Sequence, residues 1–229
     1  MIKPIALIET AFPWAHRKGT IVPYSELSIH AESMAMRYAL SAFEGVRGYV
    51  QVTGGVLMFA LDEHVERLSQ TLALVALPPI PSAVVYSVVE EIIEHNRPEE
   101  DCYLRIAANA TSMGTLKVDA QTELFVSLHQ MGRKPIPPDG LAVLISTRRK
   151  APNDAFPQQA KVIGNYAGPR LAYLEARAAG FDDVILLGPS GQLAEAPTAN
   201  LFIARGGIVA TPRLNDGILP GITRRHIIQ

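Results

Sequence analysis

Short runs of apolar and aromatic residues, broken by glycine and proline, fill the first sixty positions and predict strands there. The run 46–52, the glycines at 54–55 and the run 56–59 predict a β-hairpin, because paired glycines between two such runs favour a tight turn. Two later segments, 103–109 and 122–130, return to the same strand-like pattern.

Apolar positions at helical spacing predict two helices between these strands. The first begins at Asp62, which we expect to cap it, and ends at Pro78. The second begins at Ser82 and presents an apolar face of valine and isoleucine.

The pattern changes at 131–140, where three prolines and two glycines predict a linker. Beyond it we expect a strand over 141–147 and a helix over 168–179, which Gly180 ends. A strand–turn–strand over 184–195 and a hairpin over 200–211 follow.

Helices and antiparallel hairpins are therefore clustered along the chain instead of alternating strictly. This order favours an α+β fold over a doubly wound parallel sheet. The linker separates an N-terminal domain, 1–130, from a second domain, 141–229.

Composition excludes several classes of partner. The formal net charge is −1, and no block of basic residues stands apart from acidic ones, so neither nucleic acid nor a membrane surface is an expected partner. A single cysteine excludes an internal disulfide and a multi-cysteine zinc site, and we expect no metal. The N-terminal stretch 1–11 lacks the features of a secretory signal, and no apolar run has the length of a membrane span, so we expect a cytoplasmic protein.

Common catalytic motifs are missing from the sequence, which has no dinucleotide-binding, Walker A, zinc-protease or nucleophile-elbow pattern. The tripeptide 30–32, His-Ala-Glu, opens a zinc deaminase signature, but the two cysteines which that chemistry needs are absent. We expect Cys102 to pack as a small apolar side chain. We expect His64, on a charged helix face, to be solvated.

Three segments share the residue types that one cofactor requires: 161–166 (KVIGNY), 191–202 (GQLAEAPTANLF) and 219–224 (LPGITR). Pyridoxal phosphate (PLP) needs a lysine for its imine and an acid that keeps its pyridine nitrogen protonated. It also needs a phosphate site, which the first N–H groups of a helix and a threonine hydroxyl supply. Taken alone, Lys161 would be a solvated charge, and the third segment a turn with an N-cap.

These segments resemble those of fold-type IV PLP enzymes: branched-chain aminotransferases, D-amino-acid transaminases and aminodeoxychorismate lyases. The resemblance covers nearly the whole chain and extends to 43–49 (FEGVRGY), 63–68 (EHVERL), 103–105 (YLR) and 149–153 (RKAPN). It implies a two-domain fold with a small α/β domain and a larger, β-rich pseudo-barrel domain.

The resemblance also implies the cofactor contacts. Lys161 resembles the lysine that forms the Schiff base, Tyr166 the tyrosine on the phenolate oxygen, and Glu195 the carboxylate facing the pyridine nitrogen. Leu219 would pack under the ring. Asn200 is expected to organise a strand turn instead of touching substrate. The phosphate would be held by the residues Arg67, Gly221, Ile222 and Thr223.

On the substrate side, segment 43–49 resembles branched-chain aminotransferases more than the other two subfamilies. Tyr38 and Phe43 would form an apolar pocket, and Tyr103 and Arg105 would meet carboxylates, since a guanidinium suits the second carboxylate of glutamate. Arg47 could either neighbour the site or pair structurally with Glu44, and the structural role is slightly favoured.

The implied reaction is transamination between branched-chain L-amino acids and 2-oxoglutarate, with Lys161 as general base in an enzyme that is a homodimer or larger. Two alternatives stay open. One is another fold-type IV reaction, by a lyase or by a D-amino-acid or amine transaminase. The other is an inactive, truncated homologue, because family members continue beyond position 229 and we expect the end of the large domain to be missing.

Overall fold

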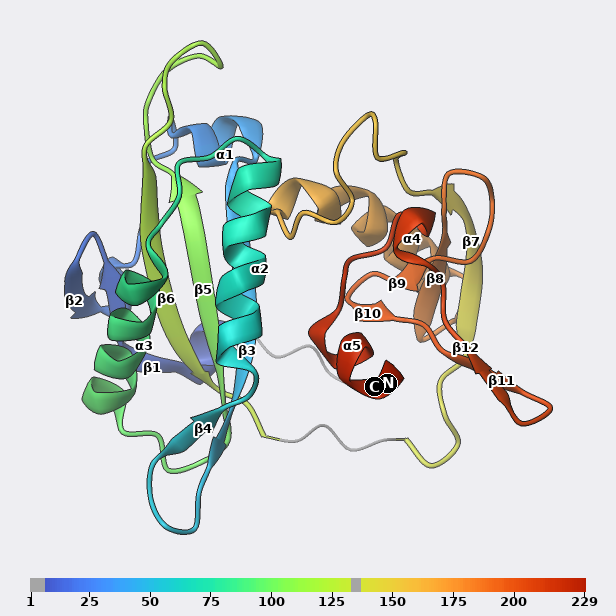
Figure 1. Ribbon diagram of the computed structural model, residues 1–229, viewed down its shortest axis with the longest axis horizontal. Coiled ribbons are helices and arrows are strands. Elements are labelled where there is room, and N and C mark those ends of the chain that lie inside the picture. The colour runs from blue at the N-terminus through green and yellow to red at the C-terminus, as the bar shows by residue number, and fades with distance from the viewer. Residues whose placement is uncertain (1–6, 133–136) are drawn as a thin grey trace. The chain divides into compact units, whose positions relative to one another are not determined.

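The computed structural model describes residues 7–132 and 137–229 (Figure 1). The chain divides into two compact units. The first comprises Ile2–Lys134 and Val162–Gly164, and the second Pro135–Lys161 and Asn165–Gln229. Each is described here by itself. The predicted linker, 131–140, lies partly outside the described residues.

The first unit is built on a six-stranded antiparallel sheet with the strand order β2-β1-β6-β5-β3-β4. The predicted hairpin is confirmed: Gly48 of β3 pairs with Met58 of β4, and Gly54 and Gly55 in the turn both have positive φ angles. The strands are β1 (Ala11–Arg17), β2 (Thr20–Pro23), β3 (Ser41–Val50), β4 (Val56–Met58), β5 (Cys102–Ala110) and β6 (Thr122–Gln130).

Two helices of this unit follow the predicted pattern. Helix α2 (Leu61–Leu74) begins one residue before Asp62, so the predicted cap is wrong. Its N-cap is Ala60 in a left-handed conformation, and Asp62 instead lies in the first turn, where a negative charge favours the helix dipole. Helix α3 (Ser82–Asn96) begins at Ser82 as expected. A short helix, α1 (Met34–Tyr38), and the 3-10 turns η1 (Leu7–Thr10) and η2 (Tyr24–Glu26) complete the unit.

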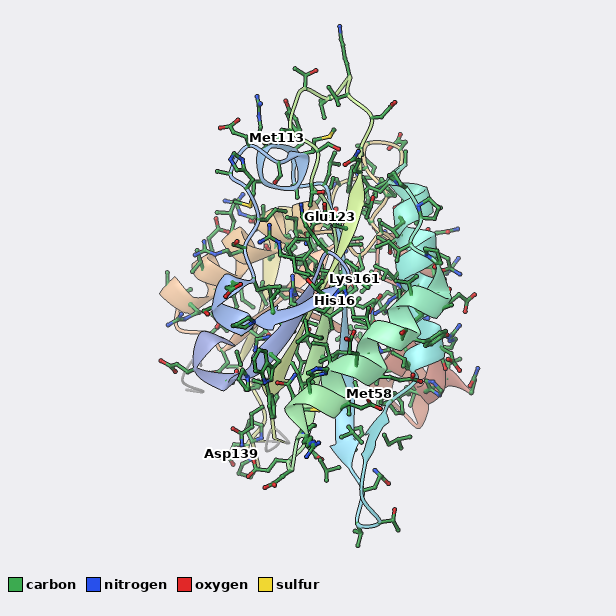
Figure 2. The ribbon with its side chains drawn as sticks, turned by 90° about the vertical axis from the view of Figure 1, so that its left-hand side faces the viewer. His16, Met58, Met113, Glu123, Asp139 and Lys161 are labelled. Atoms are coloured by element: carbon green, nitrogen blue, oxygen red, sulfur yellow. The ribbon has the colours of Figure 1, made fainter. Side chains whose placement is uncertain are left out.

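The two faces of the sheet differ in polarity because side chains alternate along each strand. One face is covered by α2 and α3, and its apolar residues are buried: Ala42, Val46, Leu104, Ile106, Val126 and Leu128 on the strands, with Val65, Leu68, Leu72, Val85, Val88 and Ile92 on the helices. His16 of β1 lies on this face (Figure 2), where burial lowers its pKa and Glu91 of α3 opposes that shift. The opposite face carries Phe43, Tyr103 and Arg105.

The second unit contains a parallel pair, β7 (Val143–Arg149) and β8 (Asp183–Leu187), joined through α4 (Ala167–Ala178). Helix α4 covers the pair with Ala172 and Ala176, which pack against Val184 and Leu186. The helix ends as predicted, with Gly180 at φ +87°. The chain thus contains one strand–helix–strand unit alongside its antiparallel sheet.

Short elements follow β8. The predicted return strand over 192–195 is reduced to a bridge between Leu187 and Leu193, while Glu195 pairs with Asn200 in the next hairpin. The predicted hairpin at 200–211 is present over a shorter range. These elements are β9 (Glu195–Ala196), β10 (Ala199–Asn200), β11 (Ile203–Arg205), β12 (Ile208–Ala210), η4 (Leu214–Asp216) and α5 (Ile222–Ile228). One further 3-10 turn, η3 (Ile163–Tyr166), directly precedes α4.

Within the described residues, no helix combines the length and the apolar character that crossing a membrane requires.

Candidate active site

Lys161 lies two residues before a single 3-10 turn, Ile163–Tyr166, which brings Tyr166 back to it. Lys161 Nζ donates a hydrogen bond to Tyr166 Oη at 2.9 Å and lies 5.5 Å from the centre of the tyrosine ring. The turn is fixed by Asn165, whose Nδ2 donates to the carbonyl oxygens of Pro157 and Ala160. The first segment of the predicted site is therefore one local, hydrogen-bonded unit.

Glu195 is 7% exposed, and three donors surround its carboxylate. Lys150 Nζ forms an ion pair with Oε1, and Asn200 Nδ2 donates to Oε2 at 3.0 Å. The backbone N–H of Leu219 donates to both oxygens at 3.1–3.2 Å. The second and third predicted segments thus meet at this carboxylate.

The balance of charge around Glu195 is incomplete. Burial raises the pKa of this carboxyl, and the charge and hydrogen bond of Lys150, the Leu219 N–H and the more distant Lys161 lower it without cancelling the effect of burial. The net direction is upward, so the carboxylate would gain stability from a further cationic donor.

Asn200 organises the strand turn, as expected, and it also joins the two segments: besides Glu195, its Nδ2 reaches the carbonyl oxygen of Leu219 at 3.0 Å. A Cβ on Gly221 would collide with Asn200 Oδ1, which explains a glycine at this position. Gly221 is the N-cap of α5, whose first residues are Ile222 and Thr223.

Arg67 belongs to the first unit and is buried against Glu44. Its Nε and Nη2 each donate to one carboxylate oxygen at 2.7 Å, a bidentate geometry, and His64 Nδ1 lies 2.7 Å from Oε2. Burial raises the pKa of Glu44, but the hydrogen bonds and charges of Arg67 and His64 exceed that effect and leave it lowered. The predicted contact of Arg67 with phosphate stays a prediction.

Two expectations about neighbouring side chains are wrong. His64 is 8% exposed and not solvated, because it lies one turn before Leu68 on the buried face of α2. The partner of Glu44 is Arg67, not Arg47. Positions 44 and 47 lie on opposite faces of β3, and Arg47 Nη2 donates to the carbonyl oxygen of Gly132. Cys102 is buried as expected, and burial raises the pKa of its thiol to about 11.

The structure brings three of the predicted substrate residues together on the face of the sheet opposite α2 and α3. The Arg105 guanidinium lies 4.3 Å from the centre of the Phe43 ring. Burial raises the pKa of Tyr103, while the charge and hydrogen bond of the neighbouring Arg105 lower it. The Tyr103 hydroxyl lies over Gly45, where a Cβ would leave no room for it. Tyr38 is half-buried at the end of α1, with the Arg37 guanidinium 5.4 Å from its ring centre.

Arg105 also lines a cavity of about 270 Å³ within the first unit. Its polar side chains include Ser41, Asn109 and Ser127, none of which the sequence singled out. Ser41 Oγ donates to Asn109 Oδ1 at 2.6 Å across β3 and β5. The available signal was the alternation of side chains along each strand. It places Ser41, Asn109 and Ser127 on the same face of the sheet as Phe43 and Arg105.

Sequence reasoning also missed Lys150, which it named only within the segment 149–153. The signal was its position: it directly follows β7, whose carboxyl end lies beside that of the parallel strand β8.

The family model for class IV aminotransferases ("Amino-transferase class IV") matches residues 41–229. A probable branched-chain-amino-acid aminotransferase of Aquifex aeolicus is 31% identical over 220 residues, which are 94% of this chain and 70% of that protein.

Two solved structures are similar throughout the fold. The branched-chain aminotransferase of Thermoproteus uzoniensis with norvaline has a TM-score of 0.89 and 29% identity, over 95% of this chain and 73% of the other. The branched-chain amino acid aminotransferase of T.th., complexed with N-(5'-phosphopyridoxyl)-L-glutamate, has a TM-score of 0.85 and 30% identity, over 95% of this chain and 72% of the other.

Proposed function

Because this chain belongs to the class IV aminotransferase family, we propose that it transfers amino groups between branched-chain L-amino acids and 2-oxoglutarate with PLP as its cofactor. The observation that carries the proposal lies within the second unit. There Lys161 donates a hydrogen bond to Tyr166, and its charge acts on the buried carboxylate of Glu195. The surrounding groups do not fully offset the effect of burial on the pKa of Glu195.

The residues of this unit fit the cofactor. When bound, PLP supplies an electron sink, on condition that its pyridine nitrogen stays protonated. Glu195 offers a charged acceptor for that N–H, and the upward pKa shift that burial causes is what a cationic partner would relieve. Lys161 Nζ would hold the cofactor and later take up and return the substrate's α-proton, while Tyr166 Oη fixes the position of that nitrogen.

The third segment supplies the remaining proposed contacts. The Leu219 backbone is fixed by its N–H bond to Glu195, so its side chain has a defined place under the ring. The first turn of α5 offers the N–H groups of Ile222 and Thr223 to a phosphate, and Gly221 at its N-cap brings no side chain between them. Arg224 anchors the helix through Thr211 Oγ1 and the carbonyl oxygen of Pro212. We include Arg67 as the arginine of the phosphate site.

For substrate, we propose that Phe43 and Tyr38 contact the branched side chain and that Tyr103 and Arg105 bind carboxylate. The cation–π contact with Phe43 holds the Arg105 guanidinium at the cavity, where it can meet a carboxylate with two parallel hydrogen bonds. The norvaline and phosphopyridoxyl-glutamate complexes of similar enzymes support, respectively, an apolar aliphatic side chain and a second carboxylate in the substrate.

We further propose a small domain at 1–130, a linker at 131–140 and a cofactor domain at 141–229, which the two compact units support. A homodimer or larger assembly, in the cytoplasm, completes the proposal; the oligomeric state can be measured by light scattering.

The decisive experiment is an absorbance titration with PLP. The purified chain should develop a visible band of lysine-bound cofactor, and Lys161→Ala should lack it at saturating PLP. Glutamate with 4-methyl-2-oxopentanoate should then give 2-oxoglutarate and leucine. A chain without the band, or one that reacts with D-alanine alone, contradicts the proposal.

A further inference from the structure

Lys150 and Glu195 form an ion pair that is almost closed to water. Their side chains are 7% and 10% exposed, although the residues lie 45 positions apart in the sequence. Removing a lysine or glutamate from water costs several kcal/mol, as a rough general figure, unless an opposite charge compensates it. Each member of the pair therefore depends on the other for its charge.

The backbone holds the two residues at one edge of the parallel pair. Lys150 directly follows β7, and its N–H donates to the carbonyl oxygen of Leu187 at the end of β8 at 2.8 Å. The turn after β8 then returns through the Leu187–Leu193 bridge and delivers Glu195 two residues later. The backbone of this unit therefore brings Lys150 and Glu195 together.

The donors around Glu195 occupy most of its hydrogen-bonding capacity. A carboxylate has about four lone-pair positions. Lys150 and Asn200 fill one position each, and the Leu219 N–H, shared between both oxygens, brings the total to four hydrogen bonds from three donors. Since that shared N–H can be satisfied by one oxygen alone, the other oxygen can accept one further N–H.

Among these donors, the asparagine amide and the backbone N–H are neutral: they orient the carboxylate, and the Leu219 N–H also lowers its pKa, but neither brings a positive charge. The cations that act on Glu195 are Lys150, in direct contact, and Lys161, at longer range. Without Lys150, burial would be opposed mainly by neutral groups, and the carboxyl would keep its proton to a higher pH.

We propose that Lys150 is a positioning residue that keeps Glu195 ionised and turned so that one lone pair faces the ring nitrogen of PLP. The inference rests on the proposed function for the identity of that ring. Lys150 itself does not touch the cofactor; it acts through Glu195. A neutral residue in its place lets Glu195 take up a proton, and a protonated carboxyl no longer attracts the pyridinium.

The first test needs no cofactor. Urea unfolding is measured from pH 4 to 9 for wild type, Lys150→Met, Lys150→Arg and Glu195→Gln. Lys150→Met should move the pH at which Glu195 titrates upward, and Lys150→Arg should restore it. In the Glu195→Gln background, Lys150→Met should produce no such shift. The matched control is Arg148→Met, which removes an exposed cation from the neighbouring ion pair and should leave the profile unchanged.

The second test adds PLP and follows the visible band at each pH. Lys150→Met should bind PLP about tenfold more weakly, equal to about 1.4 kcal/mol, and the loss should grow as the pH falls. Lys150→Arg should bind within about twofold of wild type. A purely structural pair would weaken binding equally at every pH, in both variants.

The outcomes separate the two proposals. If wild type shows no Lys161-dependent band, the proposed function fails, while the first test still decides whether Lys150 controls Glu195. If the band forms and Lys150→Met has the wild-type titration, or shifts it equally in Glu195→Gln, the role of Lys150 is overturned. An equal loss of PLP affinity at every pH overturns it as well.

Discussion

Each compact unit buries a carboxylate against a cation, yet the net pKa shifts of the two carboxylates have opposite directions. Glu44 receives two hydrogen bonds from the guanidinium of Arg67 and a further contact from His64, and its pKa is lowered. Glu195 receives one ammonium and two neutral donors, and its pKa is raised. The difference lies in the partners, since both carboxylates are nearly inaccessible to water.

Protein groups alone compensate the charge of Glu44, whereas Glu195 can still gain from a charged ligand. The interactions of Glu44 more than offset its burial, so the group can tie α2 to β3 permanently. Those of Glu195 do not offset its burial, and this deficit is what a protonated pyridine nitrogen would remove. A carboxylate in the environment of Glu44 would gain less stability from binding a cationic ring.

The largest expected effect is that of Glu44→Gln. It keeps the shape of the side chain but leaves the buried Arg67 without its counter-charge, so unfolding free energy should fall by about 3–5 kcal/mol. Urea denaturation at pH 7 measures it. Glu175→Gln, which changes an exposed partner of Arg148, is the control and should leave the unfolding midpoint unchanged. If Glu44→Gln matches this control, the compensation argument is wrong.

A smaller loss of stability is expected when the packing of Asn200, which donates to Glu195, is disturbed at Gly221. Gly221→Ala places a methyl group against Asn200 and should displace its amide from Glu195, costing about 1–3 kcal/mol of stability. PLP affinity should fall with it. Gly168, in the first turn of α4, has open space around it, so Gly168→Ala should be neutral or slightly stabilising. Equal behaviour of the two variants would contradict the proposed contact.

The sequence predicted much of this fold, because periodicity reports local structure. Both long helices and the β3–β4 hairpin lie where the apolar spacing and the paired glycines place them. The same periodicity, applied more strictly, would have found His64 on the buried face, since it precedes Leu68 by four residues. Periodicity could not show that His64 contacts Glu44, because that carboxylate lies on β3, which packs against the helix.

The candidate site divides in the same way. Lys161 and Tyr166, five residues apart, are joined by a local turn that a motif can encode. Lys150 and Glu195 meet only because β7 and β8 are parallel neighbours, which is a long-range fact. A sequence pattern carries no record of the cation that a buried carboxylate will find 45 positions away.

The third prediction concerns pH and distinguishes the two carboxylates by sign. The lowered pKa of Glu44 means that it stabilises the fold above pH 4.5, the ordinary value for a glutamate, and that this contribution disappears as the pH falls through the folded-state value. The raised pKa of Glu195 has the reverse effect: its contribution is complete below pH 4.5 and is lost as the pH rises through the folded-state value.

Urea unfolding curves of wild type, Glu44→Gln and Glu195→Gln between pH 3 and 8 test these signs. The difference between wild type and Glu44→Gln should grow with rising pH, and that between wild type and Glu195→Gln should shrink. Two differences of the same slope would show that the partners do not set the direction.

The smallest expected effect is at Arg148 and Glu175, a third pair with bidentate contacts but with half of each side chain exposed. Burial is nearly absent here, so the hydrogen bonds of the pair and, next, its opposite charges raise the pKa of Arg148 and lower that of Glu175. Water and salt screen such pairs, and Arg148→Met should shift the melting temperature only slightly. The shift should vanish near about 1 M salt, where the Debye length is about 3 Å. A large or salt-resistant loss would mean that pairing stabilises without burial, and it would remove the reason for setting the two buried carboxylates, Glu44 and Glu195, apart from this exposed pair.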